Sequence, residues 1–413
     1  MRKRKGLFFS VPSISVDKTL TPVIEALCDS GCEIVCYNTR AFAPPAARQA
    51  RFKPYPPYEV GFDTSRMTRR TSYFDYAEML LDTAIALRDF LQREVEVEAP
   101  DFILHSHLAL WGKVVAARQR LPAVALYSTF VMDSRIMIPM FRALNQEGSK
   151  IDGDLRQFVR CQRKYRTLYD AVDASQRPDV WDAYVNKEGL NVSFILKGFQ
   201  EQLDLFRPPE YRFVGHPTRA TPHAGDDRRL VYMALGTILD NDVAFLTLGL
   251  HVFAQLDCPC LMVLGKVSQD ALGPIPPHVR VAGFVDQEAM LGEAAVFITM
   301  GGMASVQEAV SALTPMIILP ETPEQRITAR RIEALGIGVS LNRERLTDEE
   351  LLAAIRYLIS ARTTYVDHLR ALQRRTPAIP PARLAEAYIT EYLQAAPPAA
   401  REEIARSVPA PAE

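Results

Sequence analysis

Short apolar runs alternate along most of the chain with longer segments in which apolar and polar positions are mixed. Brief apolar runs bounded by glycine, proline or polar residues are typical of buried strands, and amphipathic segments between them are typical of crossover helices. A regular alternation of the two predicts parallel sheets covered by helices. We therefore predict an α/β protein.

The first half of the chain carries five apolar runs. The predicted strands of a first sheet are residues 7–11, 33–37, 102–104, 123–127 and 192–195. A helix is predicted at about 20–28, where Gly31 follows as a stop, and a long helix at 74–95. Residues 51–61 are rich in proline and aromatic side chains and are predicted to form a loop.

The second half repeats this pattern after a break at residues 216–229, which contain prolines and paired aspartates. Its predicted strands are residues 230–235, 260–264, 279–282, 296–299 and 316–319. Helices are expected after Asp240, Gln287, Gly302, Gln325 and Thr347. We predict a first domain at 1–215, a linker at 216–229, a second domain at 230–380, and a C-terminal helix with a frayed tail at 381–413.

Composition narrows the class of partner. The 413 residues are enough for about two domains. A net charge of -1, from 48 basic and 49 acidic residues, argues against nucleic acid and favours small molecules. The six cysteines lack paired spacing, and the apolar run after the basic start is too short for a signal peptide. We expect a cytoplasmic protein with reduced thiols and no transmembrane segment; a homodimer is compatible with the sequence.

A pair of glycines marks the most informative site. The strand predicted at 296–299 runs into Met300, Gly301 and Gly302, and Ser305 lies in the helix that follows. Glycines between a strand and a helix start allow a phosphate to approach backbone N–H groups. The alternative is a tight turn without a ligand.

Several segments, in the same order along both halves, resemble the macrolide and natural-product glycosyltransferases of the UDP-glycosyltransferase superfamily. In the second half the resemblance rests on residues 231–237, 284–287, 301–308, 320–325 and 329–331. In the first half it rests on residues 100–103, 111–112 and 211–215.

The resemblance implies a GT-B fold, in which two facing Rossmann-like domains enclose a cleft. It also implies metal-independent, inverting sugar transfer from a UDP- or dTDP-sugar to a small apolar natural product such as an antibiotic precursor, with no cofactor. Phe284 would stack on the base, Glu308 would bind the ribose, and Glu324 would meet the sugar. The donor-binding set is Gly236, Thr237, Phe284, Val285, Gln287, Met300, Gly301, Gly302, Ser305, Glu308, Glu324 and Gln325. The alternatives are a core aromatic for Phe284 and a solvated carboxylate for Glu308.

The active site departs from the family pattern. Met300 stands where the family carries a phosphate-binding histidine, and Ser15 where it carries the histidine that acts as general base. Ser106 replaces the aspartate that orients that base. A serine hydroxyl cannot take up a proton at neutral pH, so Asp17 is the leading substitute and His107 another.

Other interpretations of these residues stay open. Asp17 can instead cap the first helix. His105 and His107 should share one face of their strand, where structural hydrogen bonding competes with catalysis. A metal site there would need further ligands, so none is predicted. A catalytically silent binding subunit and a repurposed enzyme on the same fold are the alternative functions.

Overall fold

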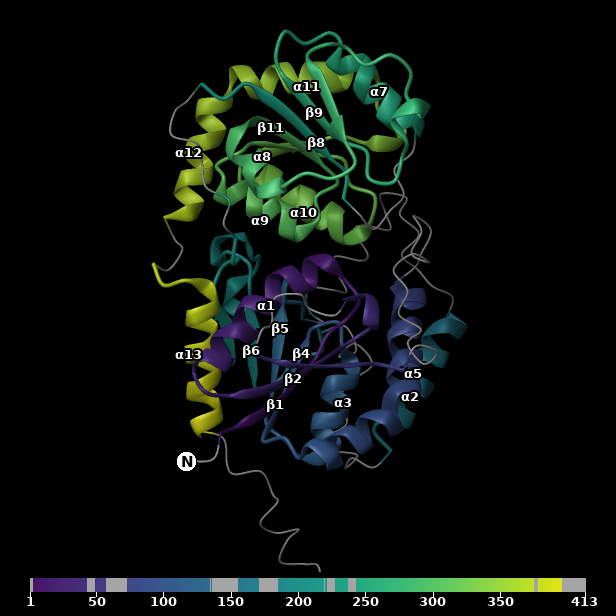
Figure 1. Ribbon diagram of the computed structural model, residues 1–413, viewed down its shortest axis with the longest axis vertical. Helices are drawn as coiled ribbons and strands as arrows, with labels where there is room; N and C mark the ends of the chain where they lie inside the picture. Colours follow the sequence, from purple (N-terminus) through teal and green to yellow (C-terminus); the bar gives the residue numbers. More distant parts are fainter. Residues whose placement is uncertain are drawn as a thin grey trace, which may run out of the picture.

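The computed structural model describes residues 3–42, 49–56, 73–133, 135, 155–170, 185–218, 220, 227–236, 243–374 and 378–395. Their strands form two sheets, stacked along the long axis of the molecule in Figure 1. The N-terminal sheet has the order β3-β2-β1-β4-β5-β6-β7 and the C-terminal sheet β10-β9-β8-β11-β12-β13. Every described strand pair is parallel, which confirms the predicted α/β class.

The N-terminal sheet contains more strands than the apolar runs predict. Its strands are β1 Lys5–Phe9, β2 Glu33–Asn38, β3 Arg51–Pro54, β4 Phe102–Ser106, β5 Ala123–Tyr127, β6 Leu190–Ser193 and β7 Tyr211–Phe213. The loop prediction is wrong at β3, which pairs with β2 from Val35 to Asn38 and carries Pro54 at its end, on the sheet edge. The strand β7 was not predicted because three residues carry too little periodicity.

Helices cover both faces of this sheet (Figure 1). They are α1 Ile14–Asp29, α2 Tyr73–Glu98, α3 Leu110–Gln119 and α5 Leu155–Leu168, with short 3₁₀ turns η1 Arg40–Phe42, η4 Lys197–Phe199 and η5 Leu203–Leu205. The prediction for α2 is confirmed. The prediction for α1 is wrong at its start, which lies at Ile14. Val16 extends the buried stripe of Leu20, Val23 and Leu27 by one turn, and this brings the polar residues before it into the helix.

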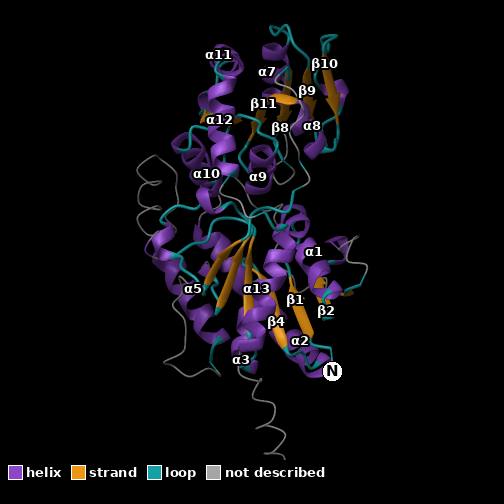
Figure 2. Ribbon diagram, turned by 90° about the vertical axis from the view of Figure 1, so that its left-hand side faces the viewer, coloured by secondary structure: helices purple, strands orange, loops and turns teal. Residues whose placement is uncertain are grey.

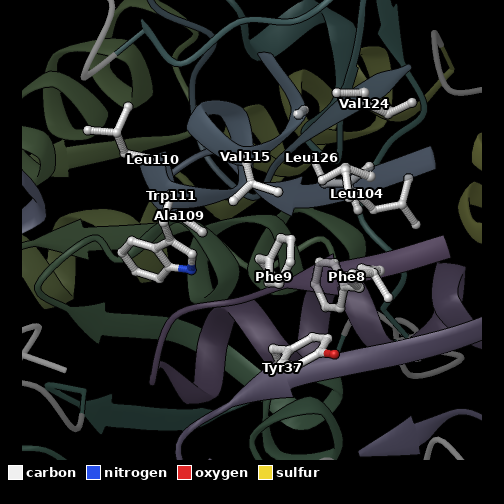
Figure 3. Close-up of a cluster of buried hydrophobic side chains, with 14 of the residues drawn as sticks. Phe8, Phe9, Tyr37, Leu104, Ala109, Leu110, Trp111, Val115, Val124 and Leu126 are labelled. Atoms are coloured by element: carbon white, nitrogen blue, oxygen red, sulfur yellow. The ribbon is translucent and has the colours of Figure 1, made fainter. Parts of the chain in front are cut away.

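Aliphatic and aromatic side chains, among them Phe9, Tyr37 and Trp111, pack together in the core of the N-terminal domain (Figure 3). Trp111 donates from Nε1 to the hydroxyl of Tyr55 at 2.9 Å, and Tyr55 donates to the carbonyl of Ser10 at 3.0 Å. A Cβ on Gly112 would lie 2.5 Å from Cβ of His105, so only glycine allows α3 to pack this closely on β4. The core thus fixes β1 and β4, whose carboxyl ends carry candidate site residues.

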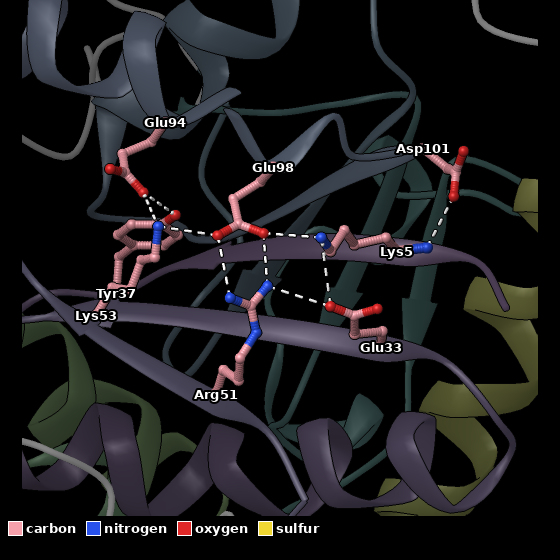
Figure 4. Close-up of polar contacts among 8 residues, drawn as sticks. All are labelled: Lys5, Glu33, Tyr37, Arg51, Lys53, Glu94, Glu98 and Asp101. Atoms are coloured by element: carbon pink, nitrogen blue, oxygen red, sulfur yellow. Dashed lines mark hydrogen bonds and ion pairs between the residues drawn. The ribbon is translucent and has the colours of Figure 1, made fainter. Parts of the chain in front are cut away.

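A network of ion pairs joins the starts of the first three strands to the end of α2 (Figure 4). Glu98 lies 2.8 Å from Nζ of Lys5, 2.5 Å from Nη2 of Arg51 and 2.8 Å from Nζ of Lys53. Glu33 lies 3.1 Å from the same Arg51 nitrogen. Because these residues sit at the amino ends of the strands, the network is structural and remote from the domain interface.

The C-terminal sheet follows the predicted strands closely. Its strands are β8 Leu230–Ala234, β9 Cys260–Val263, β10 Val279–Ala282, β11 Ala294–Thr299, β12 Met316–Ile318 and β13 Gly338–Ser340. The helices are α7 Val243–Phe253, α8 Gln287–Glu293, α9 Met303–Ser311, α10 Pro323–Ala334, α11 Asp348–Ser360 and α12 Arg362–Gln373, and the 3₁₀ turns are η6 Gln269–Ala271 and η7 Arg343–Arg345. The short strand β13 and the helix α12 were not predicted.

The last described helix, α13 Pro381–Ala395, returns to the N-terminal domain (Figures 1 and 2). Leu384 and Ile389 are buried in the core of that domain, and Arg383 pairs with Asp29 of α1 at 3.0 Å. The chain therefore passes between the two domains twice. None of the helices in the described part of the chain is long and apolar enough to cross a membrane.

Candidate functional site

Residues that follow the carboxyl ends of the strands meet where the two domains touch. Thr129, beyond β5, donates to Oε1 of Glu324 in α10 at 2.6 Å. The amide of Leu196, beyond β6, donates to Gln307 in α9 at 3.0 Å. Ligands of open α/β sheets bind outside the carboxyl ends of the strands, so this interface is the place to look for a site.

The glycine turn after β11 opens α9 toward this interface. Gly301 has a φ of +89°, and a Cβ there would lie 2.8 Å from Cγ2 of Ile318, so the position requires glycine. Gly302 is the N-cap of α9, and a Cβ on it would meet nothing within 4 Å. Because glycine has no side chain to cap the first N–H groups, the helix start retains the donors that bind anions.

Met300, which directly precedes this turn, has a buried side chain. It is buried in the core of the C-terminal domain, where Nη1 of Arg343 lies 3.6 Å from its sulfur and Gly236 packs beside it. Arg343 in turn pairs with Glu321 and stacks over the ring of Phe245 at 4.3 Å. The thioether offers no donor to a phosphate, as the sequence indicates. Thr237, the neighbour of Gly236 in the predicted set, lies outside the described residues.

A hydrogen-bonded group lies one turn into α9. Nε2 of Gln287 donates to Oγ of Ser305 at 3.0 Å and to Oε2 of Glu308 at 2.6 Å. Glu308 is only 1% exposed, so the alternative of a solvated carboxylate is wrong. Three residues of the predicted set, Gln287, Ser305 and Glu308, are therefore brought together here by α8 and α9.

Lys18 of α1 reaches Glu308 from the other domain. Its Nζ lies 2.6 Å from Oε1 of Glu308 and 3.3 Å from Oε1 of Glu288. Burial alone would lower the pKa of Lys18, but the hydrogen bonds and charges of Glu308 and then Glu288 outweigh it, and the pKa is raised. The sequence did not reveal this contact, because the two residues are 290 positions apart and no motif links them.

Phe284 lies between β10 and α8 and is 87% exposed, so the alternative of a core aromatic is wrong. Val285 beside it is half-buried against the domain core. A large exposed ring costs free energy in water unless a partner covers it. The ring is thus available for stacking, next to the helix that carries Gln287.

The first turn of α10 holds the residues assigned to the sugar. Oε1 of Gln325 accepts hydrogen bonds from the amides of Glu321 and Thr322, at 2.8 and 3.0 Å, in a capping box. The amide nitrogen of Gln325 is therefore the part of its side chain that can meet a ligand. Glu324 is exposed and already contacts Thr129 across the interface.

Asp17 lies in the first turn of α1 but does not cap it, because Ser13 is the N-cap; that alternative is wrong. Its carboxylate accepts from Oγ of Ser10 at 3.0 Å and from Nδ2 of Asn38 at 3.1 Å. Burial raises the pKa of Asp17 to about 7, although these two hydrogen bonds act in the opposite direction. Ser15, by contrast, is exposed, with its Oγ 3.1 Å from that of Ser13.

His105 and His107 lie on one face of the sheet, as expected. Asp17 of α1 lies at the opposite face. His105 is tied to Oε1 of Glu188 at 3.1 Å, which fits a structural role. His107 stacks on Tyr127 with ring centroids 5.3 Å apart, and burial lowers its pKa to about 3. Strand alternation places Ser10, the partner of Asp17, on the opposite face. The sheet therefore separates His107 from Asp17.

A third buried histidine was not predicted. Nε2 of His216 lies 3.2 Å from the hydroxyl of Thr19 in α1. Burial and the nearby charge of Lys18 lower the pKa of His216 to about 3. The sequence suggests only a linker at this position.

Comparison with known proteins shows which proteins this chain is similar to. Residues 247–386 match the family described as erythromycin biosynthesis protein CIII-like, C-terminal domain. The chain is 24% identical over 403 residues to the NDP-glycosyltransferase YjiC of Bacillus subtilis, covering 95% of this chain and 98% of that one. It is 26% identical over 295 residues to oleandomycin glycosyltransferase of Streptomyces antibioticus, covering 68% and 64% of the two chains.

Solved structures agree on the fold. The glycosyltransferase of kitacinnamycin superposes with a TM-score of 0.80 at 24% identity, covering 95% of this chain and 100% of that one. The calicheamicin glycosyltransferase CalG4 superposes with a TM-score of 0.79 at 22% identity, covering 96% and 100%. The chain therefore has the GT-B fold, is similar in sequence to macrolide and natural-product glycosyltransferases, and matches the EryCIII-like C-terminal domain over residues 247–386.

Proposed function

We propose that the protein is a glycosyltransferase that moves a sugar from a nucleoside diphosphate to a small apolar acceptor, with inversion and without a metal ion. The observation that carries this proposal is the cluster around Gln287. An exposed aromatic ring at Phe284, a buried carboxylate at Glu308 and the uncapped start of α9 suit a base, a ribose diol and a diphosphate. The similarity to named glycosyltransferases along nearly the whole chain supports the same conclusion.

The transfer step requires a base near the acceptor, and Asp17 fits that role. In the proposed step the acceptor oxygen attacks the anomeric carbon of the sugar, the bond to the diphosphate breaks, and its electron pair stays on the diphosphate. The acceptor proton passes to the carboxylate of Asp17, whose pKa of about 7 suits proton uptake near neutral pH. Ser10 and Asn38 orient that carboxylate.

The leaving diphosphate would be stabilised by the first N–H groups of α9 and by the hydroxyl of Ser305. Glu324 and the amide nitrogen of Gln325 would contact the sugar hydroxyls at the opposite side of the donor. Ser15 has no basic group, and His107 lies across the sheet, so we assign neither of them the proton.

The first test is isothermal titration with UDP, dTDP and their glucose conjugates. The dTDP ligand is included because the structural relative VinC is solved in complex with dTDP. We expect micromolar binding that Glu308→Ala removes and that Glu293→Ala, on the exposed end of α8, leaves intact. Absence of binding to every ligand would refute a nucleoside diphosphate donor.

A catalytically silent subunit is the second candidate, and the burial of Met300 favours it. A member that had lost its phosphate-binding side chain and the usual base could keep the nucleotide site without turnover. Tight nucleotide binding without release of the diphosphate, over a panel of phenolic and alcoholic acceptors, would support this second function over the first.

A further inference from the structure

Lys18 is a charged residue of the candidate site to which the proposed reaction gives no role. It belongs to the N-terminal domain, yet its Nζ contacts Glu308, the carboxylate proposed for the ribose. The second oxygen of Glu308 accepts from Gln287. Since Glu308 is almost fully buried, a ribose hydroxyl reaches it only if one of these two partners leaves.

Lys18 is the partner that can leave. Gln287 is held inside the C-terminal domain by a second hydrogen bond, to Ser305. Lys18 comes from the opposite domain on a long flexible stem, and its side chain is nearly half exposed. An incoming ribose should therefore displace the ammonium and keep the amide.

Two anions then compete for the displaced ammonium. Glu288 carries one negative charge and already lies 3.3 Å from Nζ, while also accepting from the hydroxyl of Thr218 at 3.1 Å. A diphosphate at the start of α9 carries at least two charges, and Ser305 on that turn is linked to Glu308 through a single side chain, Gln287. Coulomb energy grows with the product of the charges, so the diphosphate is the stronger partner.

We propose that Lys18 is a donor-site residue supplied by the N-terminal domain: it holds the Glu308 carboxylate before a donor binds and passes to the diphosphate when the ribose takes its place. This inference rests on the proposed function. It assigns a cation to the leaving group in a site where Met300 provides no donor. It also links donor binding to domain contact, because the cation and the other phosphate ligands lie on different domains.

The test compares a nucleoside with its diphosphate. Dissociation constants for uridine and UDP, or thymidine and dTDP, are measured by titration calorimetry for the wild type, Lys18→Met and Lys18→Arg. Lys187→Met is the control, because Lys187 is equally exposed and pairs with Glu210 outside the site. Circular dichroism checks that each variant is folded.

We expect Lys18→Met to bind the nucleoside more tightly, because the competitor for Glu308 is gone. The ratio of the nucleoside dissociation constant to that of its diphosphate measures the gain in affinity from the diphosphate. This ratio should fall by about tenfold or more, which corresponds to the loss of one hydrogen bond to a charged group. Lys18→Arg should retain most of that gain, and Lys187→Met should change neither constant.

Two results would overturn the inference. Tighter nucleoside binding with an unchanged diphosphate gain would mean that the displaced ammonium stays on Glu288. Unchanged nucleoside binding would mean that Lys18 does not compete for Glu308. A wild type that binds neither ligand would instead refute the donor site itself, so the two failures are distinguishable.

Discussion

The buried carboxyl group of Asp17 should make the free energy of unfolding depend on pH, whether or not a substrate is bound. Its pKa is raised from 3.8 to about 7 in the folded protein, mainly by burial. The folded state therefore binds a proton more tightly than the unfolded chain, and the stability contributed by this proton is complete below about pH 4. It is lost as the pH rises through about 7.

The magnitude follows from the two pKa values. Each pKa unit corresponds to about 1.4 kcal/mol, so the ionised carboxylate costs up to about 4 kcal/mol of folding free energy above pH 7. At pH 5 the same linkage gives less than half of that cost. Asp17→Asn removes the titration but keeps the shape, so its stability relative to the wild type should increase by about 2 to 3 kcal/mol between pH 5 and pH 8.

The assay is urea denaturation of the wild type and Asp17→Asn at both pH values. Ile14→Ala is the control, because it changes the same helical turn without a titrating group. A difference in unfolding free energy that stays constant with pH would refute the burial argument. It would also remove the basis for Asp17 as the general base. If Asp17 is the base, turnover by the protein should rise with pH through about 7 and be abolished in Asp17→Asn.

Three further predictions concern packing, ion pairs and stacking. Burial alone would raise the pKa of Glu98, but hydrogen bonds from three cations lower it to about 2. The stability that this carboxylate gives to the folded protein is therefore present above about pH 4 and lost as the pH falls through 2. At pH 7, Glu98→Gln should cost about 1 to 3 kcal/mol by denaturation, because the cations that it leaves are partly exposed to water, and the exposed Glu33→Gln should cost less than about 1. Gly112→Ala should cost about 1 to 3 kcal/mol in the same assay, because its Cβ would overlap His105 of β4. The control Gly302→Ala should cost less than about 1 kcal/mol, because the space around its Cβ is open. Phe284→Ala should weaken nucleotide binding by about fivefold or more in calorimetry without lowering the melting temperature, and an unchanged affinity would exclude stacking.

Strands could be predicted wherever burial is continuous. β5 was predicted at its observed bounds because all five of its side chains are buried. β3 and β13 are short edge strands, and their residues are not long apolar runs. They exist because a neighbouring strand offers hydrogen bonds, which is a property of the sheet and not of the segment.

The candidate site, too, could be predicted only in part from the sequence. The resemblance identified Phe284 and Glu308, and the structure places the first at the surface and the second beside Gln287. The environment of Asp17 was not predictable, because the wrong start assigned to α1 left its partners unknown. Lys18 was missed because a contact between domains leaves no periodic trace in the sequence.

The return of α13 to the N-terminal domain determines how this protein could be recombined with its relatives. The N-terminal domain is assembled from two separate stretches of chain, and the helix that completes it follows the entire C-terminal sheet. A chimera made with a single cut between the halves would pair α1 with a foreign C-terminal helix, and the reciprocal chimera would leave Leu384 and Ile389 without their cavities. An exchange of the C-terminal domain should therefore replace only an internal cassette, with one junction before β8 and a second between α12 and α13.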